Sequence, residues 1–399
     1  MDVKQKAVEK HLEWKGKMEI ISRCPVTNAE ELSVAYTPGV AQPCLEIQKN
    51  PELSYQMTRR SNLVAVISDG TAVLGLGDIG PEAAMPVMEG KAVLFKEFAG
   101  VDAIPLCLDS KNVEELIRTI EMLAPSFGGI NLEDISAPRC FEIEKKLKEK
   151  LQIPVFHDDQ HGTAIVVSAA LINALKLAGK RFGDVTIVIN GAGAAGIAIA
   201  KHLISFGAGD VILCDKGGIV YDGASYINEA QQRMTVVTNR KNRQGTLADA
   251  LTGADIFIGV SRPHMVTPDM VSSMAEKAIV FAMANPTPEI MPDEAKKAGA
   301  FIVGTGRSDF PNQVNNVLAF PGIFKGALEA GATDITEGMK RAASLAIAGV
   351  LTEEERNTEC VLPNPFDKRV AICVAEAVKN AAIEEGVIRK ALLKKELLL

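Results

Sequence analysis

The feature that most constrains the fold is a glycine-rich segment, GAGAAG, set between an apolar strand-like run and an apolar helix-like run. VTIVIN (185–190) precedes it, and the helix-like run AAGIAIAKHLISF begins within it. This context matches the GxGxxG fingerprint of dinucleotide-binding folds. Glycine lets the backbone approach a pyrophosphate, and the helix N-terminus attracts its negative charge. We therefore expect a cofactor-binding loop formed by Gly191, Gly193, Ala194, Ala195 and Gly196.

A second strand-like run, VILCD (211–215), ends at an acid that follows the last of these glycines by about 20 residues, as the fingerprint requires. Asp215 can accept hydrogen bonds from the hydroxyls of the adenosine ribose, and it would repel a 2′-phosphate. We therefore expect NAD as the cofactor. Lys216 lies beside Asp215 and weakens that inference, so NADP stays open as the alternative.

Strand-like and helix-like runs alternate along the rest of this half of the chain. Further strand-like runs occupy 256–260, 278–284 and 301–305. Such alternation is typical of a parallel, doubly wound sheet. The predicted fold is α/β, with a Rossmann-type, doubly wound NAD(P)-binding domain at residues 158–315.

Residues 1–157 are expected to form a separate N-terminal α/β domain that binds the substrate. Its expected elements are an amphipathic helix at 1–20, a β-hairpin at 62–77 with its turn at Asp69-Gly70, strands at 101–109 and 128–135, and an exposed helix at 144–152. The C-terminal part, which ends in KALLKKELLL, is predicted to be mostly helical. We expect helices from about 316 to 399 to pack on the first domain.

Composition excludes several classes of function. The 399-residue chain has a net charge of −7 and no basic block, which argues against nucleic acids and anionic membranes as partners. Its charged N-terminus does not resemble a signal peptide, and its longest uncharged stretch, 162–175, is too short to span a bilayer. Seven cysteines without a CxxC pair indicate reduced thiols and a cytoplasmic protein.

Two pairs of acids follow apolar strand-like runs, and such charges are costly to bury unless something compensates them. The pairs are Glu133-Asp134 and Asp158-Asp159. Carboxylates that converge at a domain junction suit a hard cation such as Mg²⁺ or Mn²⁺. Two alternatives remain: solvated surface charge, or a softer Zn²⁺ or Fe²⁺ site that would include His157 and His161.

Three further features are candidates for a place near the active site. Tyr36 precedes a rigid Thr-Pro-Gly turn, and Lys91 lies in an apolar helical context. Burial and a nearby cation would lower the pKa of Lys91 and let it act as a base. A second GxGxxG, made by Gly75, Gly77 and Gly80, is followed by two prolines. We expect it to form a tight loop near the active site and not a cofactor cradle.

Eight motifs in the same order resemble the malic enzymes of the compact bacterial type, over about residues 30 to 330. They are YTPGVA (36–41), SDGTAVLGLGDIG (68–80), PVMEGKAVLF (86–95), NLEDI (131–135), FHDDQHGTA (156–164), NGAGAAG (190–196), FAMANPTPEI (281–290) and TGRSDFPNQVNNVLAFPG (305–322). The resemblance implies oxidative decarboxylation of L-malate to pyruvate and CO₂, with NAD(P) and with Mg²⁺ or Mn²⁺.

The resemblance also implies roles for individual residues. Tyr36 corresponds to the general acid and Lys91 to the general base, with Asp158 as the partner of the lysine. Glu133, Asp134 and Asp159 correspond to the metal ligands. Asn285 and Asn316 correspond to substrate-binding amides, and Asn285 also lies against the cofactor. Larger members carry a carboxylate-binding arginine where this chain has Ala72, and His161 has no role assigned by the resemblance.

Further expectations concern assembly and rival activities. The resemblance implies a homodimer or a larger homo-oligomer, and the N-terminal helix with Trp14 is either a dimer contact or packed internally. A malolactic enzyme, which releases lactate, would use the same groups. A non-redox oxaloacetate decarboxylase would not need GAGAAG or Asp215, and a non-catalytic nucleotide sensor would not need Tyr36 or Lys91.

Overall fold

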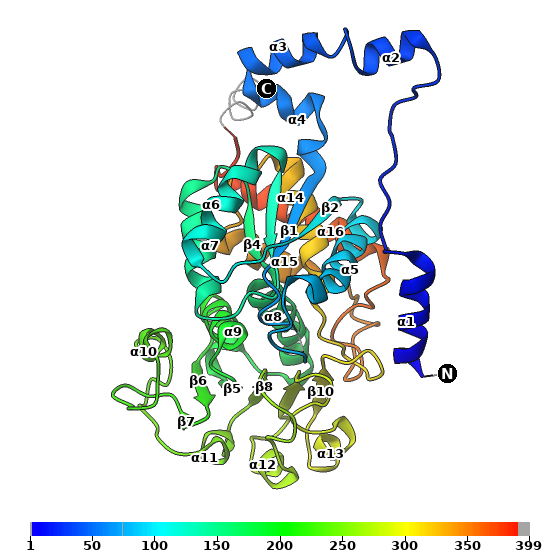
Figure 1. The fold of residues 1–399 in the computed structure, drawn as a ribbon. Helices are drawn as coiled ribbons and strands as arrows, with labels where there is room; N and C mark the ends of the chain where they lie inside the picture. The colour runs from blue at the N-terminus through cyan, green and yellow to red at the C-terminus, as the bar shows by residue number, and fades with distance from the viewer. Residues whose placement is uncertain (1, 74, 390–399) are drawn as a thin grey trace.

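Two parallel sheets, one above the other, form the body of the protein (Figure 1). The structure is a computed structural model and describes residues 2–73 and 75–389. Helix α8 (Asp158–Ala178) lies between the sheets and contributes to the core that they share. The predicted α/β class with a doubly wound, Rossmann-type sheet is confirmed.

The first sheet has four parallel strands in the order β2-β1-β3-β4. Along β1, Val64 and Val66 face the core formed with α5 and α8, while Ala65 and Ile67 face the core under α6 and α7. A strand buried on both faces is an uninterrupted apolar run, as in LVAVIS. The strands are β1 (Leu63–Ser68), β2 (Asp102–Cys107), β3 (Gly129–Leu132) and β4 (Val155–His157); the helices are α5 (Pro81–Ala99), α6 (Val113–Leu123) and α7 (Arg139–Lys150).

The predicted hairpin at 62–77 is wrong. Both neighbours of β1 are parallel to it, and residues 69–80, apart from residue 74, form a loop with a single antiparallel bridge between Val73 and Gly77. Burial of both strand faces favours parallel pairing over a hairpin. Gly70 instead packs tightly on the end of this loop, since a Cβ there would lie 2.2 Å from the carbonyl oxygen of Gly80.

The second sheet has the order β10-β9-β8-β5-β6-β7, and only the short β7 is antiparallel. The chain runs outward from β5 to β6 and then returns to the other side of β5 with β8. The carboxyl ends of β5 and β8 therefore flank a topological switch point, where ligands of such sheets bind. The strands are β5 (Thr186–Asn190), β6 (Asp210–Asp215), β7 (Gly218–Ile219), β8 (Ile256–Gly259), β9 (Ile279–Ala282) and β10 (Ile302–Thr305).

The last three described helices return to the first sheet and to α8. On α14 (Phe320–Ala330), the rings of Phe320 and Phe324 pack against Phe95 of α5, with centroids 4.7 and 5.3 Å away. The amide of Asn173 on α8 donates to the last turn of α15 (Glu337–Gly349), and α16 (Lys368–Glu384) packs on α14. The helix predicted for KALLKKELLL falls on residues 390–399, which lie outside the described residues.

One of the remaining helices, α9 (Ala194–Ser205), packs on α8 and contributes to the core, and the others lie further out. α9 follows the glycine-rich segment, and the others are α1 (Val3–Trp14), α2 (Ala29–Ala35), α3 (Ala41–Lys49), α4 (Ser54–Met57), α10 (Glu229–Thr235), α11 (Leu247–Leu251), α12 (Pro268–Ser272) and α13 (Pro292–Lys297). Among the described residues, α8 alone is long and apolar enough to cross a bilayer. Most of its apolar window is buried inside the protein, as expected of a core helix.

Candidate active site

Three carboxylates converge at the carboxyl edge of the first sheet. Glu133 and Asp134 follow β3, and Asp159 is the second residue of α8; one oxygen from each lies within 4.8 Å of the other two. The backbone of Asp134 has a φ of +53°, a left-handed conformation that aspartate tolerates better than most residues. This turn lets its N–H donate to Oδ2 of Asp159 at 2.8 Å. Both acid pairs thus meet, as predicted.

Lys91 reaches this cluster from α5. Its Nζ lies 2.7 Å from Oδ2 of Asp158 and 2.8 Å from Oε1 of Glu133, and it sits 4.4 Å from the centre of the Phe320 ring. Lys91 is only 8% exposed and Asp158 is fully buried. The predicted burial of this lysine is therefore correct.

Two neighbours hold the carboxylate of Asp158. The amide of Asn316 donates to its Oδ2. Gly162, one turn further along α8, leaves room for Oδ1, because a Cβ there would lie 2.0 Å from that oxygen. Among the described residues, Oδ1 has no hydrogen-bond partner. The sequence predicted Asn316 in the site, but no sequence signal indicated Gly162.

Burial and mutual repulsion leave the acids of this cluster electrostatically unsatisfied. Burial raises the pKa of Glu133, Asp134, Asp158 and Asp159, and neighbouring carboxylates raise it further. Burial acts to lower the pKa of Lys91, but Asp158 and Glu133 outweigh it and raise that pKa. The shift is opposite to the expected one, because four carboxylates surround a single ammonium.

The donor set fits a hard divalent cation. Glu133, Asp134 and Asp159 offer oxygen ligands, the type that Mg²⁺ and Mn²⁺ prefer. A dication among them would offset the excess of negative charge that raises their pKa values. Asn131 supports this arrangement, because its Nδ2 donates to Oε2 of Glu133 at 2.8 Å.

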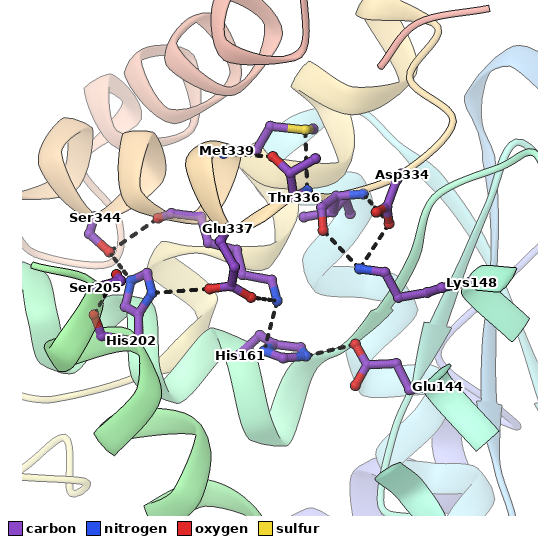
Figure 2. Close-up of polar contacts among 12 residues, drawn as sticks. Glu144, Lys148, His161, His202, Ser205, Asp334, Thr336, Glu337, Met339 and Ser344 are labelled. Carbon is purple, nitrogen blue, oxygen red and sulfur yellow. Dashed lines mark hydrogen bonds and ion pairs between the residues drawn. The ribbon is translucent and has the colours of Figure 1, made fainter. Parts of the chain in front are cut away.

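The geometry argues against His161 as a ligand in the alternative of a softer, histidine-containing metal site. His161 points away from the three carboxylates: its Nε2 lies 2.7 Å from Oε1 of Glu144, and its Nδ1 lies 3.1 Å from Nζ of Lys340 (Figure 2). His157 is buried beside the cluster: its Nδ1 lies 3.8 Å from Oδ2 of Asp159, and neither of its ring nitrogens has a hydrogen-bond partner among the described residues. Burial lowers the pKa of both imidazoles.

The nucleotide half has the local geometry that the glycine fingerprint predicts. The GAGAAG segment joins β5 to α9, and Gly191 has a φ of +114°. A Cβ on Gly191 would lie 2.6 Å from the carbonyl oxygen of Val260, and one on Gly196 would lie 1.9 Å from that of Gly191. Only glycine fits these positions without moving backbone, so the loop stays tight and open to a pyrophosphate.

Asp215 lies at the end of β6, as predicted. Its Oδ1 accepts from the backbone N–H of Lys216 at 2.9 Å, and Nε2 of Gln231 donates to its Oδ2. The same amide nitrogen donates to the carbonyl of Ala192 in the glycine-rich loop at 3.1 Å. Gln231 therefore ties the acid to the loop, a role that no sequence motif indicated.

The two halves meet beside the cluster. Ala194, at the start of α9, packs against the core of the first sheet. Asn285 lies beside the 69–80 loop, since a Cβ on Gly75 would lie 3.8 Å from its carbonyl oxygen. That loop borders the cluster, because Ala72 donates from its N–H to the carbonyl of Asp134. The tight loop predicted for the first GxGxxG thus lies next to the carboxylates.

Because Ala72 replaces the expected carboxylate-binding arginine in the 69–80 loop, another cation would have to neutralise a substrate carboxylate there. The guanidinium of Arg139 approaches Ala72, donating at 2.8 Å to Oγ1 of the preceding residue, Thr71. Arg139 also forms an ion pair with Asp69 at 2.7 Å. The charge of this arginine is therefore already partnered within the protein.

Tyr36 is not brought to the site. It caps the C-terminal end of α2, is 67% exposed, and its hydroxyl forms no hydrogen bond with any described residue. Figure 1 shows α2 and α3 projecting well away from α5 and α8. Trp14 on α1 is also half exposed, and no residue of that helix is buried, so internal packing of α1 is not observed.

Comparison with known proteins gives matches along nearly the whole chain. Residues 15–148 match the family "Malic enzyme, N-terminal domain", and residues 160–383 match "Malic enzyme, NAD binding domain". A bifunctional malic/malolactic enzyme of Bacillus subtilis is 55% identical over 98% of this chain and 95% of its own. An NAD-dependent malic enzyme of Geobacillus stearothermophilus is 55% identical over 94% of this chain and 78% of its own.

A solved structure agrees with these matches. The NAD-dependent malic enzyme of Thermotoga maritima superposes with a TM-score of 0.91 at 50% identity, covering 94% of this chain and 98% of that one. The resemblance inferred from the eight motifs is thereby confirmed. The chain belongs to the malic enzyme family, a family of NAD(P)-dependent oxidoreductases.

Proposed function

We propose that this protein catalyses the oxidative decarboxylation of L-malate to pyruvate and CO₂, with NAD as the hydride acceptor and with Mg²⁺ or Mn²⁺. The observation that carries this proposal is the position of Lys91. Its Nζ lies within 2.8 Å of both Asp158 and Glu133, at the edge of a three-carboxylate cluster that borders the nucleotide half. A base, a cation site and a cofactor loop are thus neighbours.

Lys91 is the proposed general base. In its neutral form, Nζ would take the proton of the C2 hydroxyl of malate, and Asp158 with Asn316 would keep that nitrogen in place. Phe320 closes one side of the lysine and keeps water from it. Glu133, Asp134 and Asp159 would hold the cation, which would act as a Lewis acid and would supply positive charge that favours the neutral form of Lys91.

The remaining residues serve binding and the last proton transfer. Asn285 and Asn316 are the proposed amide contacts of the substrate, and Asn285 also contacts the cofactor. The loop from Gly191 to Gly196 would hold the pyrophosphate, and Asp215 would accept from the ribose hydroxyls, with the bound nicotinamide receiving the hydride. Tyr36 would donate the proton to C3 after CO₂ has left.

Each of the two proposed domains contains one of the two sheets. Residues 1–157, with the C-terminal helices from about 316 onward, make up the proposed substrate domain, and residues 158–315 the proposed NAD-binding domain. We further propose a cytoplasmic homodimer or larger homo-oligomer. The seven free cysteines suit a reducing compartment.

The test is a spectrophotometric assay of nicotinamide reduction with malate and Mn²⁺, run in parallel with NAD and NADP. Chromatography of the products then separates this proposal from its main rival. Net NADH with pyruvate supports the proposal, whereas lactate without net NADH would identify a malolactic enzyme. The 55% identity to a relative named bifunctional malic/malolactic enzyme is the reason to measure both products.

A further inference from the structure

A buried carboxylate that the proposed mechanism does not use lies at the carboxyl edge of the second sheet. Glu289 has no exposed surface. Its Oε1 accepts from the backbone N–H of Ser261 and its Oε2 from that of Ala284, each at 3.0 Å. Ser261 lies in the loop after β8 and Ala284 in the loop after β9. Glu289 therefore joins these two loops through hydrogen bonds to their main chain.

The fold leaves space for this carboxylate and fixes the backbone that carries it. A Cβ on Gly259, the last residue of β8, would lie 2.3 Å from Cδ of Glu289, so only glycine fits there. The carbonyl of Glu289 accepts from the N–H of Val266 at 3.1 Å, and that of Pro288 accepts from the N–H of His264 at 3.3 Å. The side chain thus extends from a fixed segment into a space that matches it.

The charge of Glu289 has no ionic partner among the described residues. Burial raises the pKa of its carboxyl, and backbone N–H donors oppose that rise. An ionisable group is costly to bury without a counter-charge, and an apolar side chain would fill the same space without that cost. What an apolar side chain could not supply is a pair of acceptors aimed at two loops.

The two loops border the nicotinamide side of the proposed cofactor site. Asp215, at the end of β6, is the proposed partner of the adenosine ribose, and the loop from Gly191 to Gly196 would hold the pyrophosphate. Because a dinucleotide spans the switch point of such a sheet, its nicotinamide half would extend over the ends of β8 and β9. Ser261 also contacts the strand that leads into the glycine-rich loop, since Nδ2 of Asn190 donates to its hydroxyl at 2.8 Å.

The loop after β9 carries a proposed contact of both substrate and cofactor. Asn285 follows Ala284 directly, so the hydrogen bond from Ala284 to Glu289 fixes the backbone beside it. The carbonyl of Asn285 lies beside the 69–80 loop, and its Nδ2 lies against the loop after β10, where a Cβ on Gly306 would be 2.9 Å away. Release of the β9 loop from Glu289 would therefore displace a group that lies between substrate and cofactor.

We propose that Glu289 is a positioning residue for the nicotinamide half of the cofactor: it holds the loops after β8 and β9 and thereby sets where the ring lies relative to malate. This inference rests on the proposed function. Glu289 does not touch the reacting atoms and acts through Ser261 and Asn285. A displacement of about 1 Å can cost about 100-fold in rate, so two hydrogen bonds behind the site are sufficient to control hydride transfer.

The first test is steady-state kinetics of Glu289→Gln. The new side chain has nearly the same shape, but its NH₂ group replaces one acceptor, so one loop loses its hydrogen bond. We expect KM for NAD to rise about tenfold and kcat to fall. The inhibition constant of ADP, which carries only the adenosine and the pyrophosphate, should stay near wild type. Equal weakening of ADP and NAD, or unchanged kinetic constants, overturns the proposal.

Glu289→Asp makes the test independent of one variant. Its carboxylate stays charged but is one methylene shorter, so it cannot reach both loops, and it should give the same rise in KM for NAD without weaker ADP inhibition. Wild-type KM for NAD in this variant contradicts the need for two loop contacts.

A matched control lies at the other end of β8. Asp255 precedes that strand, and its Oδ2 accepts from the N–H of Thr186 at 2.9 Å while its Oδ1 accepts from Nζ of Lys180 at 2.7 Å. It thus joins two strands at the amino edge of the same sheet. Asp255→Asn should lower the free energy of unfolding yet leave KM for NAD near wild type. A similar rise in KM in both variants would make the effect one of general stability and overturn the proposal.

Hydrogen exchange gives a readout that needs neither cofactor nor turnover. In Glu289→Gln, the backbone N–H of Ser261 or Ala284 loses its acceptor and should exchange about tenfold faster or more. The N–H of Thr186, bonded to Asp255, should keep its wild-type rate. Residue-resolved exchange by NMR measures all three, and unchanged rates at both Ser261 and Ala284 contradict the proposed hold on the loops.

Fluorescence titration with NADH separates this inference from the proposed function. A wild type that binds NADH but does not oxidise malate refutes the proposed function alone. The role of Glu289 is then still decided by NADH affinity, which we expect to be about tenfold weaker in Glu289→Gln than in wild type. Equal NADH affinity in the two proteins overturns the inference, whether or not the wild type turns over malate.

Discussion

Two clusters of buried charge lie on either side of the start of α8, and they differ in how their charges are matched. The active-site cluster has four carboxylates, Glu133, Asp134, Asp158 and Asp159, around Lys91. The histidine network, defined here by Glu144, His161, Lys340, Glu337 and His202, connects α7, α8, α9 and α15 (Figure 2). Both are largely buried, although Glu337 at the rim of the histidine network is exposed, and both contain a lysine between acids.

The sign of the pKa shift on the acids separates the two. In the active-site cluster, burial and neighbouring carboxylates raise the pKa of every acid. In the histidine network, burial acts to raise the pKa of Glu144, but His161 and Lys340 outweigh it and lower that pKa to about 2. The imidazole of His202, whose Nδ1 lies 3.8 Å from Oε2 of Glu337, likewise acts to lower the pKa of Glu337.

This difference indicates which buried charges lack a partner within the chain and are available to bind a ligand. Acids held in their charged form by partners inside the chain are already satisfied and serve to join helices. Acids pushed toward the neutral form are unsatisfied, and a dication is the addition that would satisfy them. His161 therefore joins α8 to α7 and α15, while Asp158, one turn earlier, contacts Lys91 and belongs to the proposed catalytic site.

The largest expected effect comes from exchanging the two buried lysines in turn. Lys91→Ala should lower malate turnover by about 10²- to 10⁴-fold, because it removes the proposed general base, while NAD binding stays near wild type. Lys340→Ala should cost stability, since it leaves Glu144 and Glu337 without their ammonium, yet leave turnover per folded molecule unchanged. Steady-state kinetics, NAD titration and urea unfolding measure these quantities. Equal loss of turnover in both variants would show that the two clusters do not differ in their contribution to catalysis.

Cation binding should likewise depend on one cluster only. Wild-type protein with Mn²⁺ at about 100 times its Kd should gain about 2.7 kcal/mol of unfolding free energy. Asp134→Asn should abolish that gain, because it removes one of three converging ligands. Glu144→Gln should start from a lower stability but keep the full Mn²⁺ gain. Chemical denaturation with and without Mn²⁺ decides, and a gain that survives Asp134→Asn would place the cation elsewhere.

The two clusters should respond to pH in opposite directions. Acids with a raised folded pKa favour the folded state below their ordinary pKa, and that contribution is lost as the pH rises through the raised value, about 7 for Asp158. Glu144 has a lowered pKa, so its contribution is present above its ordinary value of 4.5 and is lost as the pH falls toward about 2.

We therefore expect chelator-treated protein to lose stability as the pH rises from the ordinary pKa of 3.8 to the raised value of about 7 for Asp158, and Mn²⁺ to suppress the loss. Glu144→Gln should weaken only the loss on the acid side. Urea unfolding over a pH series measures both losses of stability, the one at rising pH and the one at falling pH. If Mn²⁺ left the loss of stability at rising pH unchanged, the assignment of the unsatisfied acids to a cation site would be contradicted.

The smallest expected effect lies outside both clusters. Asp215→Ser removes an ionised acceptor of the ribose hydroxyls, a contact worth roughly 1.5 kcal/mol, so kcat/KM with NAD should fall about tenfold and preference should shift toward NADP. Gln231→Ala, which only frees that carboxylate, should give a weaker shift in the same direction. Preference that stays constant in Asp215→Ser would mean that another residue selects the cofactor.

Prediction from the sequence succeeded where local pattern and function coincide. The alternation of strands and helices indicated the second sheet, and the acids after β3 and β4 could be expected to meet because parallel strands end at one edge. It failed for the hairpin at 62–77, because Asp69-Gly70 is a turn signal whose outcome depends on which strands flank β1. The pairing of His161 with Glu144 and Lys340 carried no signal at all.

The chain alone thus determined the repeating local chemistry: apolar periods, glycine where backbone must approach a ligand, and acids at strand ends. Tertiary structure decided which charges are partnered and where Tyr36 lies, because hydrogen bonds such as that between Lys340 and His161 join residues 179 positions apart. Short-range patterns depend only on neighbouring residues, so they can be recognised in the sequence. Electrostatic balance is a sum over everything within a few ångströms, and only the folded arrangement sets its terms.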